Sequence, residues 1–568
     1  MDLREQIRRA AGDGPVDLLL TNARVVNVWS GEIHPASVAI HQGIIVGFGE
    51  YEAVRRVDLE GRYLAPGFID GHIHIESSML AVPELARQIV PLGTTALVAD
   101  PHEIANVLGV DGVRYLLESS ENVPLRVFLM FPSCVPATPF ETSGAVLSHA
   151  DMAPFKDHER VLGLAEMMNF PGLIGADPEI LAKIAVFKDK VLDGHAPGLS
   201  GKGLNAYAGA GIRSDHECTT LEEAQNKLRV GMRIMIRQGS AAKNLETLLP
   251  VVNDHNSRNC FFVTDDLDPR DIGEHGHINN LIRMAIARGL NPVRAIQMAT
   301  LNTASYFRIP RLGAIVPGYE ADLVVLEDLE RVTVHSVYQK GSLVAQEGTL
   351  MVPSVSRSSV SVRSKVIVDW DKVRDFTIPA SGTRANIIGV VPGQVVTRRL
   401  VEAPPVRDGL VIPDTERDIL KIAVIERHKG TGAYAVALIK GFGLQRGAMA
   451  STVAHDAHNI IVVGANDADM FVASRELAVM GGGFVVVDNG VVTGKLPLPI
   501  AGLMSDAPVE EVKAGLAHVR EAAQKLGCPL EAPFAVLAFM ALTPIPELKL
   551  TDQGLFDSVN FRFISLFD

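Results

Sequence analysis

The stretch LAPGFIDGHIHIESSM, residues Leu64–Met79, contains two histidines, His72 and His74, that are separated by one residue. On a β-strand, side chains two residues apart point to the same face, so both imidazoles can share a metal ion at a strand end. The HxH spacing alone is weak, because polar residues also alternate along ordinary half-buried strands. Further residues along the chain are needed to distinguish metal ligands from ordinary strand positions.

The pattern of predicted strands and helices changes along the chain. Short β-branched runs cut by turn residues occur on both flanks, and we expect residues 1–65 plus 312–352 to form one sheet domain. Within 66–311, short apolar strands alternate with helical stretches, and about 245 residues suits eight βα units closing into a barrel. A Ser- and Val-rich linker at 353–365 precedes a third domain of strands and helices at 366–568.

Composition narrows the class of partner. Charged residues make up 21% of the 568-residue chain, and its net charge of −13 disfavours nucleic-acid binding, which needs a basic surface. The longest apolar run, FAVLAFMAL at Phe534–Leu542, is too short to span a membrane and predicts a buried helix or strand. The N-terminus resembles no secretory signal, and the four cysteines show no CxxC spacing. We expect a cytoplasmic homo-oligomer, a dimer or larger, that acts on a small molecule.

Further metal-ligand types follow apolar strands downstream of the HxH. Each of them alone reads as a solvated strand end, but a barrel brings the carboxyl ends of its strands to one face. Several imidazoles with bridging carboxylates suit two divalent first-row metals better than magnesium or calcium, which prefer oxygen ligands. Such ions lower the pKa of a bound water and favour hydrolysis. We therefore interpret His72 and His74 as ligands, together with Glu166, His195, His216 and Asp265 or Asp266.

The motifs APGFIDGHIH, TDD and NPVRAIQMATLNTASYFRIPRLGAIVPGYEADLVVL resemble the amidohydrolase superfamily over about residues 17 to 350. This resemblance implies a distorted (β/α)8 TIM barrel flanked by a small β-sandwich. Within the superfamily, GHIHIESSM, ADPHEIANVLG and the C-terminal GFGLQRGAMASTVAHDAHNIIVVG are most similar to the bacterial-type adenine deaminases. That likeness runs along the whole chain. It implies an additional α+β C-terminal domain and hydrolysis of adenine to hypoxanthine and ammonia at two divalent metals, Mn²⁺ or Fe²⁺, with Zn²⁺ also accepted.

The resemblance also implies individual roles. His72 and His74 match the ligands of the first strand, and His195 and His216 match those of strands five and six. Glu166 stands where many relatives carry a carboxylated lysine and would bridge the metals. Asp265 matches the last-strand ligand and would also act as the base for the attacking water, with Asp266 as the alternative register.

Deamination also needs proton donors for the ring and the departing amine. Several related deaminases carry an HxxE glutamate after the fifth-strand histidine, but His195 is followed by APGLSGKG. Asp100, which ends an apolar strand, is the first candidate to replace it. His102, Glu103 and Glu217 are alternatives, although Glu103 could complement a helix N-terminus and Glu217 could orient His216.

Two other groups are weaker candidates. His275 and His277 follow the last strand, where they are loop or capping residues or touch the substrate. A C-terminal cluster belongs either to a structural or site-covering loop or to a separate metal site; it comprises His455, Asp456 and His458. The competing functions are a cyclic-amide hydrolase, against which Glu166 counts because those enzymes carry the bridging lysine, and a scaffold that has lost its metals.

Overall fold

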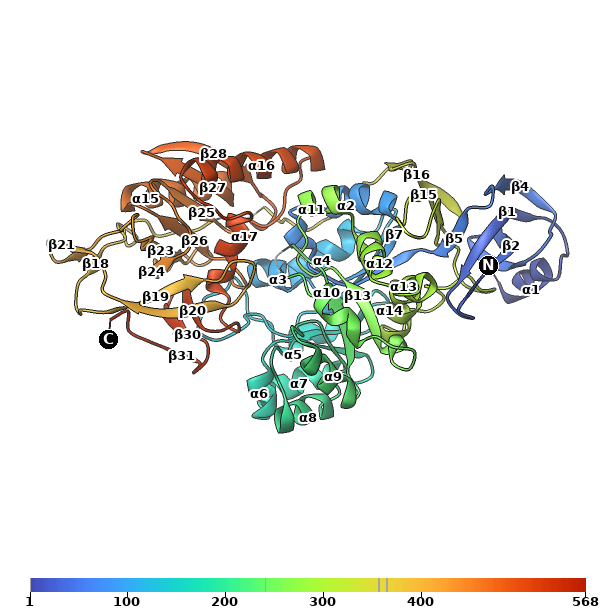
Figure 1. Ribbon diagram of the computed structural model, residues 1–568, viewed down its shortest axis with the longest axis horizontal. Helices are drawn as coiled ribbons and strands as arrows, with labels where there is room; N and C mark the ends of the chain where they lie inside the picture. Colours follow the sequence, from blue (N-terminus) through green and yellow to red (C-terminus); the bar gives the residue numbers. More distant parts are fainter. Residues whose placement is uncertain (1, 241, 356–357, 364–365, 568) are drawn as a thin grey trace.

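The computed structural model describes residues 2–240, 242–355, 358–363 and 366–567. The chain runs from an N-terminal sheet at one end of the longest axis, through a central body of strands and helices, to a C-terminal body at the other end (Figure 1). Within the described residues, no helix combines the length and the apolar character that a membrane span requires.

A nine-stranded sheet combines strands from both sides of the central body. Strand β5 pairs antiparallel with β14, so that Leu64 lies opposite Val325. Alternate side chains of these strands, among them Leu18 and Leu323, pack into a core of their own. The strands are β1 (Val16–Asn27), β2 (Glu32–His41), β3 (Ile44–Phe48), β4 (Ala53–Asp58), β5 (Tyr63–Pro66), β14 (Leu323–Leu326), β15 (Val334–Gln339), β16 (Ser342–Gln346) and β17 (Thr349–Leu350), and helix α1 (Leu3–Ala10) precedes them.

Eight parallel strands form the centre of the molecule. They are β6 (Phe68–Ile73), β7 (Thr94–Ala99), β8 (Arg126–Phe131), β9 (Val161–Met167), β10 (Val191–Gly194), β11 (Ser214–Asp215), β12 (Arg233–Arg237) and β13 (Cys260–Val263). Strands β6 to β10 form one sheet and β11 to β13 another. A parallel bridge between Ile73 and Asp265 joins the first strand to the end of the last. The curled parallel arrangement is a TIM-barrel-like α/β fold.

These strands are short and apolar because helices cover their outer face, as parallel sheets require. All six residues of β7, TTALVA, are buried. The helices are α2 (Val82–Ile89), α3 (His102–Leu108), α4 (Val110–Ser119), α5 (His149–Met152), α6 (Phe170–Ile174), α7 (Pro178–Val186), α8 (Gly201–Gly209), α9 (Leu221–Arg229), α10 (Leu245–Leu248), α11 (Pro269–His275), α12 (Ile278–Ala287), α13 (Pro292–Met298) and α14 (Leu301–Tyr306).

The C-terminal body is built on an eight-stranded sheet in the order β20-β19-β24-β23-β26-β25-β27-β28. Its strands are β19 (Ala385–Val390), β20 (Thr397–Glu402), β23 (Leu420–Ile425), β24 (Tyr434–Lys440), β25 (Ala448–Ser451), β26 (Ile460–Gly464), β27 (Gly483–Asp488) and β28 (Val491–Pro497). Two small sheets add β18 (Ile378–Pro379), β21 (Val406–Arg407), β22 (Leu410–Val411), β29 (Leu548–Thr551), β30 (Gly554–Asp557) and β31 (Arg562–Phe563). The helices are α15 (Asp467–Met480), α16 (Val509–Lys525) and α17 (Pro533–Ala538).

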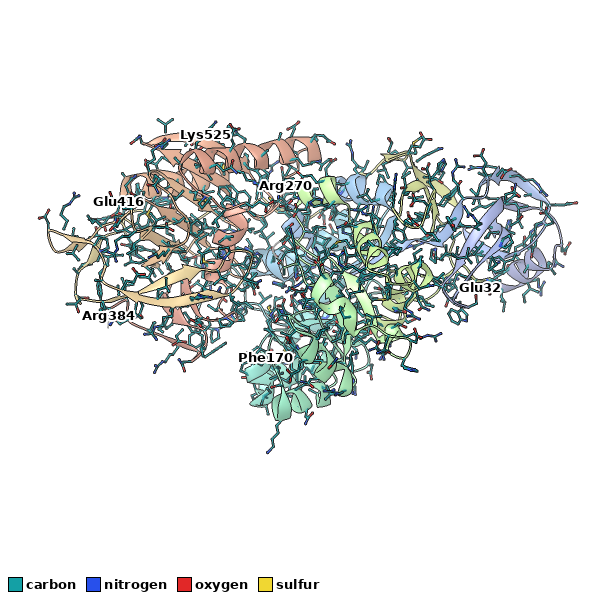
Figure 2. The ribbon with its side chains drawn as sticks, viewed as in Figure 1. Glu32, Phe170, Arg270, Arg384, Glu416 and Lys525 are labelled. Carbon is teal, nitrogen blue, oxygen red and sulfur yellow. The ribbon has the colours of Figure 1, made fainter. Side chains whose placement is uncertain are left out.

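The C-terminal body packs against the carboxyl ends of the central strands. Thr138 and Thr543 share a hydrogen bond of 2.9 Å across this boundary, and Arg270 lies there, 3.9 Å from Glu531 (Figure 2). The apolar run at Phe534–Leu542 forms most of α17 and the 3₁₀ helix η6 (Phe539–Ala541) that follows it.

The expected linker at 353–365 is described only in part, because residues 356–357 and 364–365 lie outside the described residues. Its described part contacts the barrel. Ser358 and Ser359 donate hydrogen bonds to Glu118 at the end of α4. These contacts fix the path of the segment between the two bodies.

Candidate metal centre

The two histidines of the HxH motif converge at the carboxyl end of β6. Their Nε2 atoms lie 3.2 Å apart, and both side chains are buried. Nδ1 of His74 lies 3.0 Å from the carbonyl oxygen of Asp100, which can only accept, so this nitrogen carries the proton. His74 therefore presents the lone pair of Nε2 to the interior, as a metal ligand must.

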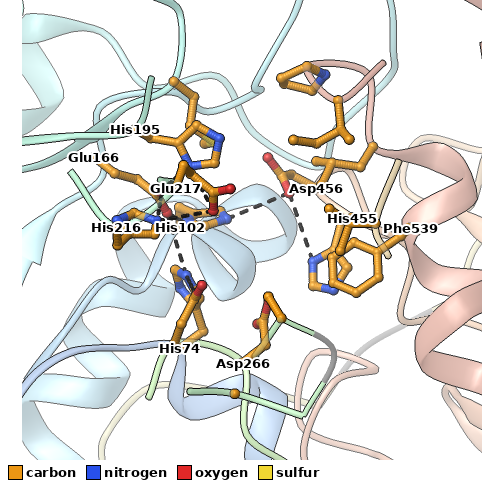
Figure 3. A pocket seen from close by; sticks show the side chains of 18 of the residues that line it. His74, His102, Glu166, His195, His216, Glu217, Asp266, His455, Asp456 and Phe539 are labelled. Carbon is orange, nitrogen blue, oxygen red and sulfur yellow. Dashed lines mark hydrogen bonds and ion pairs between the residues drawn. The ribbon is translucent and has the colours of Figure 1, made fainter. Parts of the chain in front are cut away.

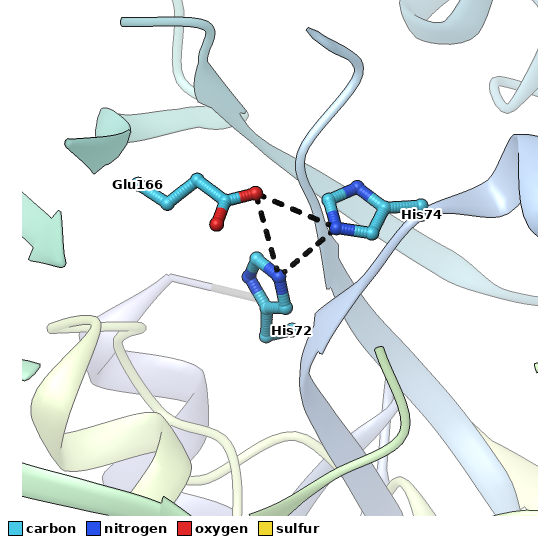
Figure 4. Close-up of side chains that lie close together, drawn as sticks. All are labelled: His72, His74 and Glu166. Atoms are coloured by element: carbon cyan, nitrogen blue, oxygen red, sulfur yellow. Dashed lines mark hydrogen bonds and ion pairs between the residues drawn. The ribbon is translucent and has the colours of Figure 1, made fainter. Parts of the chain in front are cut away.

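Glu166, near the end of β9, places its two carboxylate oxygens against different imidazoles. Oε1 lies 3.5 Å from Nε2 of His74 and 4.0 Å from Nε2 of His72 (Figure 4). Oε2 lies 2.6 Å from Nδ1 of His195 and 3.2 Å from Nε2 of His216. These two histidines directly follow β10 and β11. The Glu166 carboxylate therefore lies between two pairs of imidazoles.

Asp265 completes the cluster from the end of β13. Its Oδ1 lies 3.1 Å from Nε2 of His74. Its backbone N–H donates to the carbonyl of His72, and its φ of 61° turns the chain into the left-handed region. Asp266 also lines the cavity, but it accepts a hydrogen bond from the Ser77 hydroxyl. Of the two registers considered from TDD, the structure places Asp265 in the cluster.

The two carboxylates of the cluster, Glu166 and Asp265, are both charged. Burial raises the pKa of Glu166, but the neighbouring His195 and His216 lower it well below its ordinary value. Burial likewise raises the pKa of Asp265, and the Arg237 guanidinium more than offsets this effect. Both carboxylates are thus ionised although they are buried. Groups of three ligand atoms lie within 4.8 Å of one another, and a set of imidazoles and carboxylates fits a divalent first-row metal.

Asp100 and His102, at the end of β7 and the start of α3, form a pair beside this cluster. Asp100 accepts a hydrogen bond of 3.1 Å from the backbone N–H of His102. His102 in turn places Nδ1 3.4 Å from Oε1 of Glu166. His102 lines the cavity over the cluster, whereas Asp100 is not among the described residues that line it. Asp100 is therefore placed to orient His102.

Glu103 and Glu217 both line that cavity. Glu103 is 1% exposed, and its pKa is raised well above the ordinary value by burial and by the negative charges of Asp266 and Glu76. Glu217 lies 3.5 Å from Nε2 of His216 and accepts two hydrogen bonds from Arg237. Glu103 therefore suits the storage of a proton, and Glu217 is held as an ion pair.

Reasoning from sequence did not select Arg237. This residue ends β12, and its guanidinium donates hydrogen bonds to both Glu217 and Asp265. Its signal in the sequence is the run RIMIR, an apolar strand that ends in a charge, as the other strands of the site do. An arginine does not bind metal, so a search for ligand types passes over it.

The cavity over the cluster is lined by side chains from both bodies (Figure 3). The barrel contributes the cluster itself. The C-terminal body contributes seven residues, namely Val395, His455, Asp456, Phe539, Leu542, Pro544 and Ile545. The rings of His455 and Phe539 are stacked, with centroids 4.7 Å apart and planes at 18°. The C-terminal body therefore closes the chamber over the strand ends.

The remaining histidines lie outside the cluster. His277 is fully buried beside Thr94 and Asp70, and burial lowers its pKa to about 3. His275 ends α11 and borders a different hollow. His458 accepts a hydrogen bond at Nδ1 from the backbone N–H of Ala454, which leaves its proton on Nε2. That N–H faces Glu103 at 3.8 Å, so His458 favours the site-covering loop over a separate metal site.

Comparison with known proteins places the chain among enzymes. Residues 63–344 match the amidohydrolase family, and residues 394–562 match the adenine deaminase C-terminal domain. The adenine deaminase of Desulfatibacillum aliphaticivorans is 51% identical over 564 residues, and that of Dehalococcoides mccartyi is 49% identical over the same length; each alignment covers 99% of both chains. The adenine deaminase of Methanothrix thermoacetophila is 49% identical over 570 residues and all of both chains. With this likeness along its whole length, the chain belongs to the adenine deaminase family of amidohydrolases.

Proposed function

We propose that the protein hydrolyses adenine to hypoxanthine and ammonia. In this reaction a water oxygen bonds to C6 of the purine, and the bond from C6 to the amino nitrogen breaks. Two observations support the proposal. About half of the residues are identical to those of adenine deaminases over nearly the full length, and a buried cluster of imidazoles and carboxylates lies at the strand ends.

We assign two divalent metal ions, Mn²⁺ or Fe²⁺ with Zn²⁺ as an alternative, to six side chains: His72, His74, Glu166, His195, His216 and Asp265. Glu166 would contact both ions, because its two oxygens face different histidines. When bound, ions of this kind lower the pKa of a water molecule and polarise the bond that it attacks.

The chain's own side chains handle the protons. Asp265 accepts the proton of the attacking water, because its Oδ1 points into the cluster while Arg237 holds Oδ2. Glu103 donates its proton to the purine ring, because its raised pKa keeps it protonated, and Asp265 passes the proton of the water to the departing amine. Asp100 orients His102, and Glu217 anchors Arg237 beside the base.

The finer organisation belongs to the same proposal. We infer three domains: a β-sandwich at 1–65 plus 312–352, a metal-dependent barrel at 66–311, and a C-terminal domain at 366–568. The nine-stranded sheet that joins both flanks supports the first of these. The four free cysteines, all buried, support a cytoplasmic location, and we expect a homo-oligomer that does not bind nucleic acid.

Production of the protein with manganese, followed by quantification of hypoxanthine and ammonia released from adenine, tests the function. We expect equal amounts of both products and no release after removal of the metals with a chelator. A protein that retains its metals, folds normally and releases neither product from adenine contradicts the proposal.

A further inference from the structure

A carboxylate from the C-terminal body reaches the reaction cavity without a partner for one of its oxygens. Asp456 lies in the loop between β25 and β26 and is 3% exposed. Its Oδ1 lies 3.7 Å from Nε2 of His102 and 3.9 Å from Nδ1 of His455 (Figure 3). Its Oδ2 is buried and has no hydrogen-bond partner among the residues that the structure describes.

A buried acceptor of this kind needs an explanation, because native proteins satisfy almost all of their buried polar groups. Asp456 lines the cavity, so its carboxylate lies beside the space that a bound molecule would occupy. The side chain is also ionised: burial raises its pKa, but the charge of His102 lowers it below its ordinary value. The donor that is missing from the protein can come from the substrate.

The position of Asp456 selects which donor of the substrate it meets. The ring of His102 lies between Glu166, 3.4 Å from Nδ1, and Asp456, 3.7 Å from Nε2. The ring of His102 therefore separates Asp456 from the cluster, and Asp456 lies on the side of the C-terminal body. A substrate whose C6 faces Glu166 and Asp265 has its amino group at the cluster, and its five-membered ring extends away from it.

A neutral free purine carries one N–H on its five-membered ring, and apart from the 6-amino group this is the only donor of adenine. We propose that Asp456 is a specificity-determining residue that accepts this ring N–H and so selects the free base. The inference rests on the proposed function, since it takes adenine as the molecule in the cavity. A nucleoside carries its sugar at N9 and has no ring N–H to offer. Rejection of an analogue that leaves a buried charge unpaired is strong.

The walls around Asp456 agree with a flat, unsubstituted ligand. The stacked rings of His455 and Phe539 form one planar side of the cavity. Apolar residues of the C-terminal body, among them Leu542 and Ile545, close the space beside them. A sugar or a methyl group on the five-membered ring would press against these walls and also bury Asp456 without a donor.

Comparison of adenine with 9-methyladenine in the metal-loaded wild type, Asp456→Asn and Asp408→Asn tests this inference. Asp408 is an exposed turn residue of the same body and serves as the matched control. The wild type should prefer adenine. Asp456→Asn should lower kcat/KM for adenine by about 10- to 100-fold, the range of a hydrogen bond to a charged group, and leave the value for 9-methyladenine nearly unchanged. Metal content and the Asp408→Asn values should match those of the wild type.

Equilibrium binding of adenine and 9-methyladenine is measured in parallel, so that the preference between them is also determined independently of catalysis. An equal loss for both bases in Asp456→Asn, or no loss for adenine, overturns the assignment. A wild type that binds both bases equally overturns it without any variant. A wild type that is loaded with metal but does not deaminate adenine contradicts the proposed function, whereas an active wild type with an unchanged ratio contradicts this inference alone.

Discussion

Arg237, at the end of β12, donates a hydrogen bond to Oδ2 of Asp265, at the end of the neighbouring strand β13. The same guanidinium holds Glu217 through Nη1 and Nη2. Burial lowers the pKa of Arg237, but the two carboxylates raise it above its ordinary value, so the side chain stays charged. The contact leaves Oδ1 of Asp265 directed at His74. One arginine therefore fixes both the direction and the charge of the proposed base.

Replacement of Arg237 by Met should shift the pH dependence of catalysis. The guanidinium depresses the pKa of Asp265, so loss of the arginine should raise this pKa. Asp265 must be ionised to act, and activity is lost as the pH falls through its pKa. The acid limb of kcat/KM should therefore move to higher pH in the variant. An unmoved acid limb at full metal content would exclude this role, and Arg237→Lys, which keeps the charge, should show a smaller shift.

A second buried pair positions the loops that carry His195 and His216. Nζ of Lys227 lies 2.9 Å from Oδ2 of Asp215, and neither side chain is exposed. Asp215 also accepts hydrogen bonds from the backbone N–H groups of Ala196 and Glu217. Burial raises the pKa of Asp215, but Lys227 and further partners lower it to about 2. The pair thus joins the residues that follow both histidines.

Lys227→Met should lower the free energy of unfolding by about 3 to 5 kcal/mol, because it leaves Asp215 as an uncompensated buried charge. The stability that Asp215 contributes is present above its ordinary pKa and is lost as the pH falls toward 2, so the wild type and the variant should converge in acid. Urea unfolding at several pH values measures this difference. The exposed Lys202→Met is the control, and an equal loss in both variants would contradict the pairing argument.

The proposed ligand set could be predicted from sequence because it follows from local rules. His72 and His74 alternate on a strand, and Glu166, His195, His216 and Asp265 lie in or directly after apolar runs, where a parallel barrel ends its strands. The structure brings all six together. The choice between Asp265 and Asp266 needed the backbone turn at φ 61°, which a sequence pattern does not specify.

The residues that the C-terminal body contributes to the cavity were harder to predict from sequence, because their position depends on packing between distant segments. Asp456 meets His102 only because the C-terminal body docks on the strand ends. From spacing alone, the AHDAHN run fitted a covering loop and a separate metal site alike. The proton on His458 favours the loop, and it depends on a backbone N–H that only the folded loop brings into place. Asp100 has the sequence position of a site residue, yet its carboxylate faces His102.

Glu166→Gln should reduce metal binding at the centre more than it reduces the stability of the fold. The amide keeps the shape of the side chain but loses the charge, and it offers one acceptor oxygen in place of two. Loss of supporting groups around a metal weakens binding by about 10- to 100-fold, so loss of the proposed bridge should cost at least as much. Elemental analysis after dialysis should find less metal per chain, and deamination should fall in parallel. Full metal content would show that Glu166 does not bridge.

Lys549 gives a prediction for the C-terminal wall. Its Nζ is fully buried and donates hydrogen bonds of 2.9 Å to the carbonyl oxygens of Val395 and Phe539, two residues of the cavity. Burial lowers its pKa from the ordinary 10.5 to about 7. Between these two values the unfolded chain binds more protons than the folded chain. Linkage then requires this lysine's contribution to stability to rise with pH, by up to about 1.4 kcal/mol per pH unit.

Lys549→Met should remove that slope, because methionine does not titrate. The free energy of unfolding of the wild type should therefore increase relative to the variant from pH 7 to pH 9, as measured by urea denaturation. The exposed Lys525→Met keeps the buried group and should follow the wild type at every pH. Parallel curves for the wild type and Lys549→Met would mean that Lys549 keeps an ordinary pKa in the folded chain. In that case the two wall carbonyls would be held by a charged ammonium throughout this range.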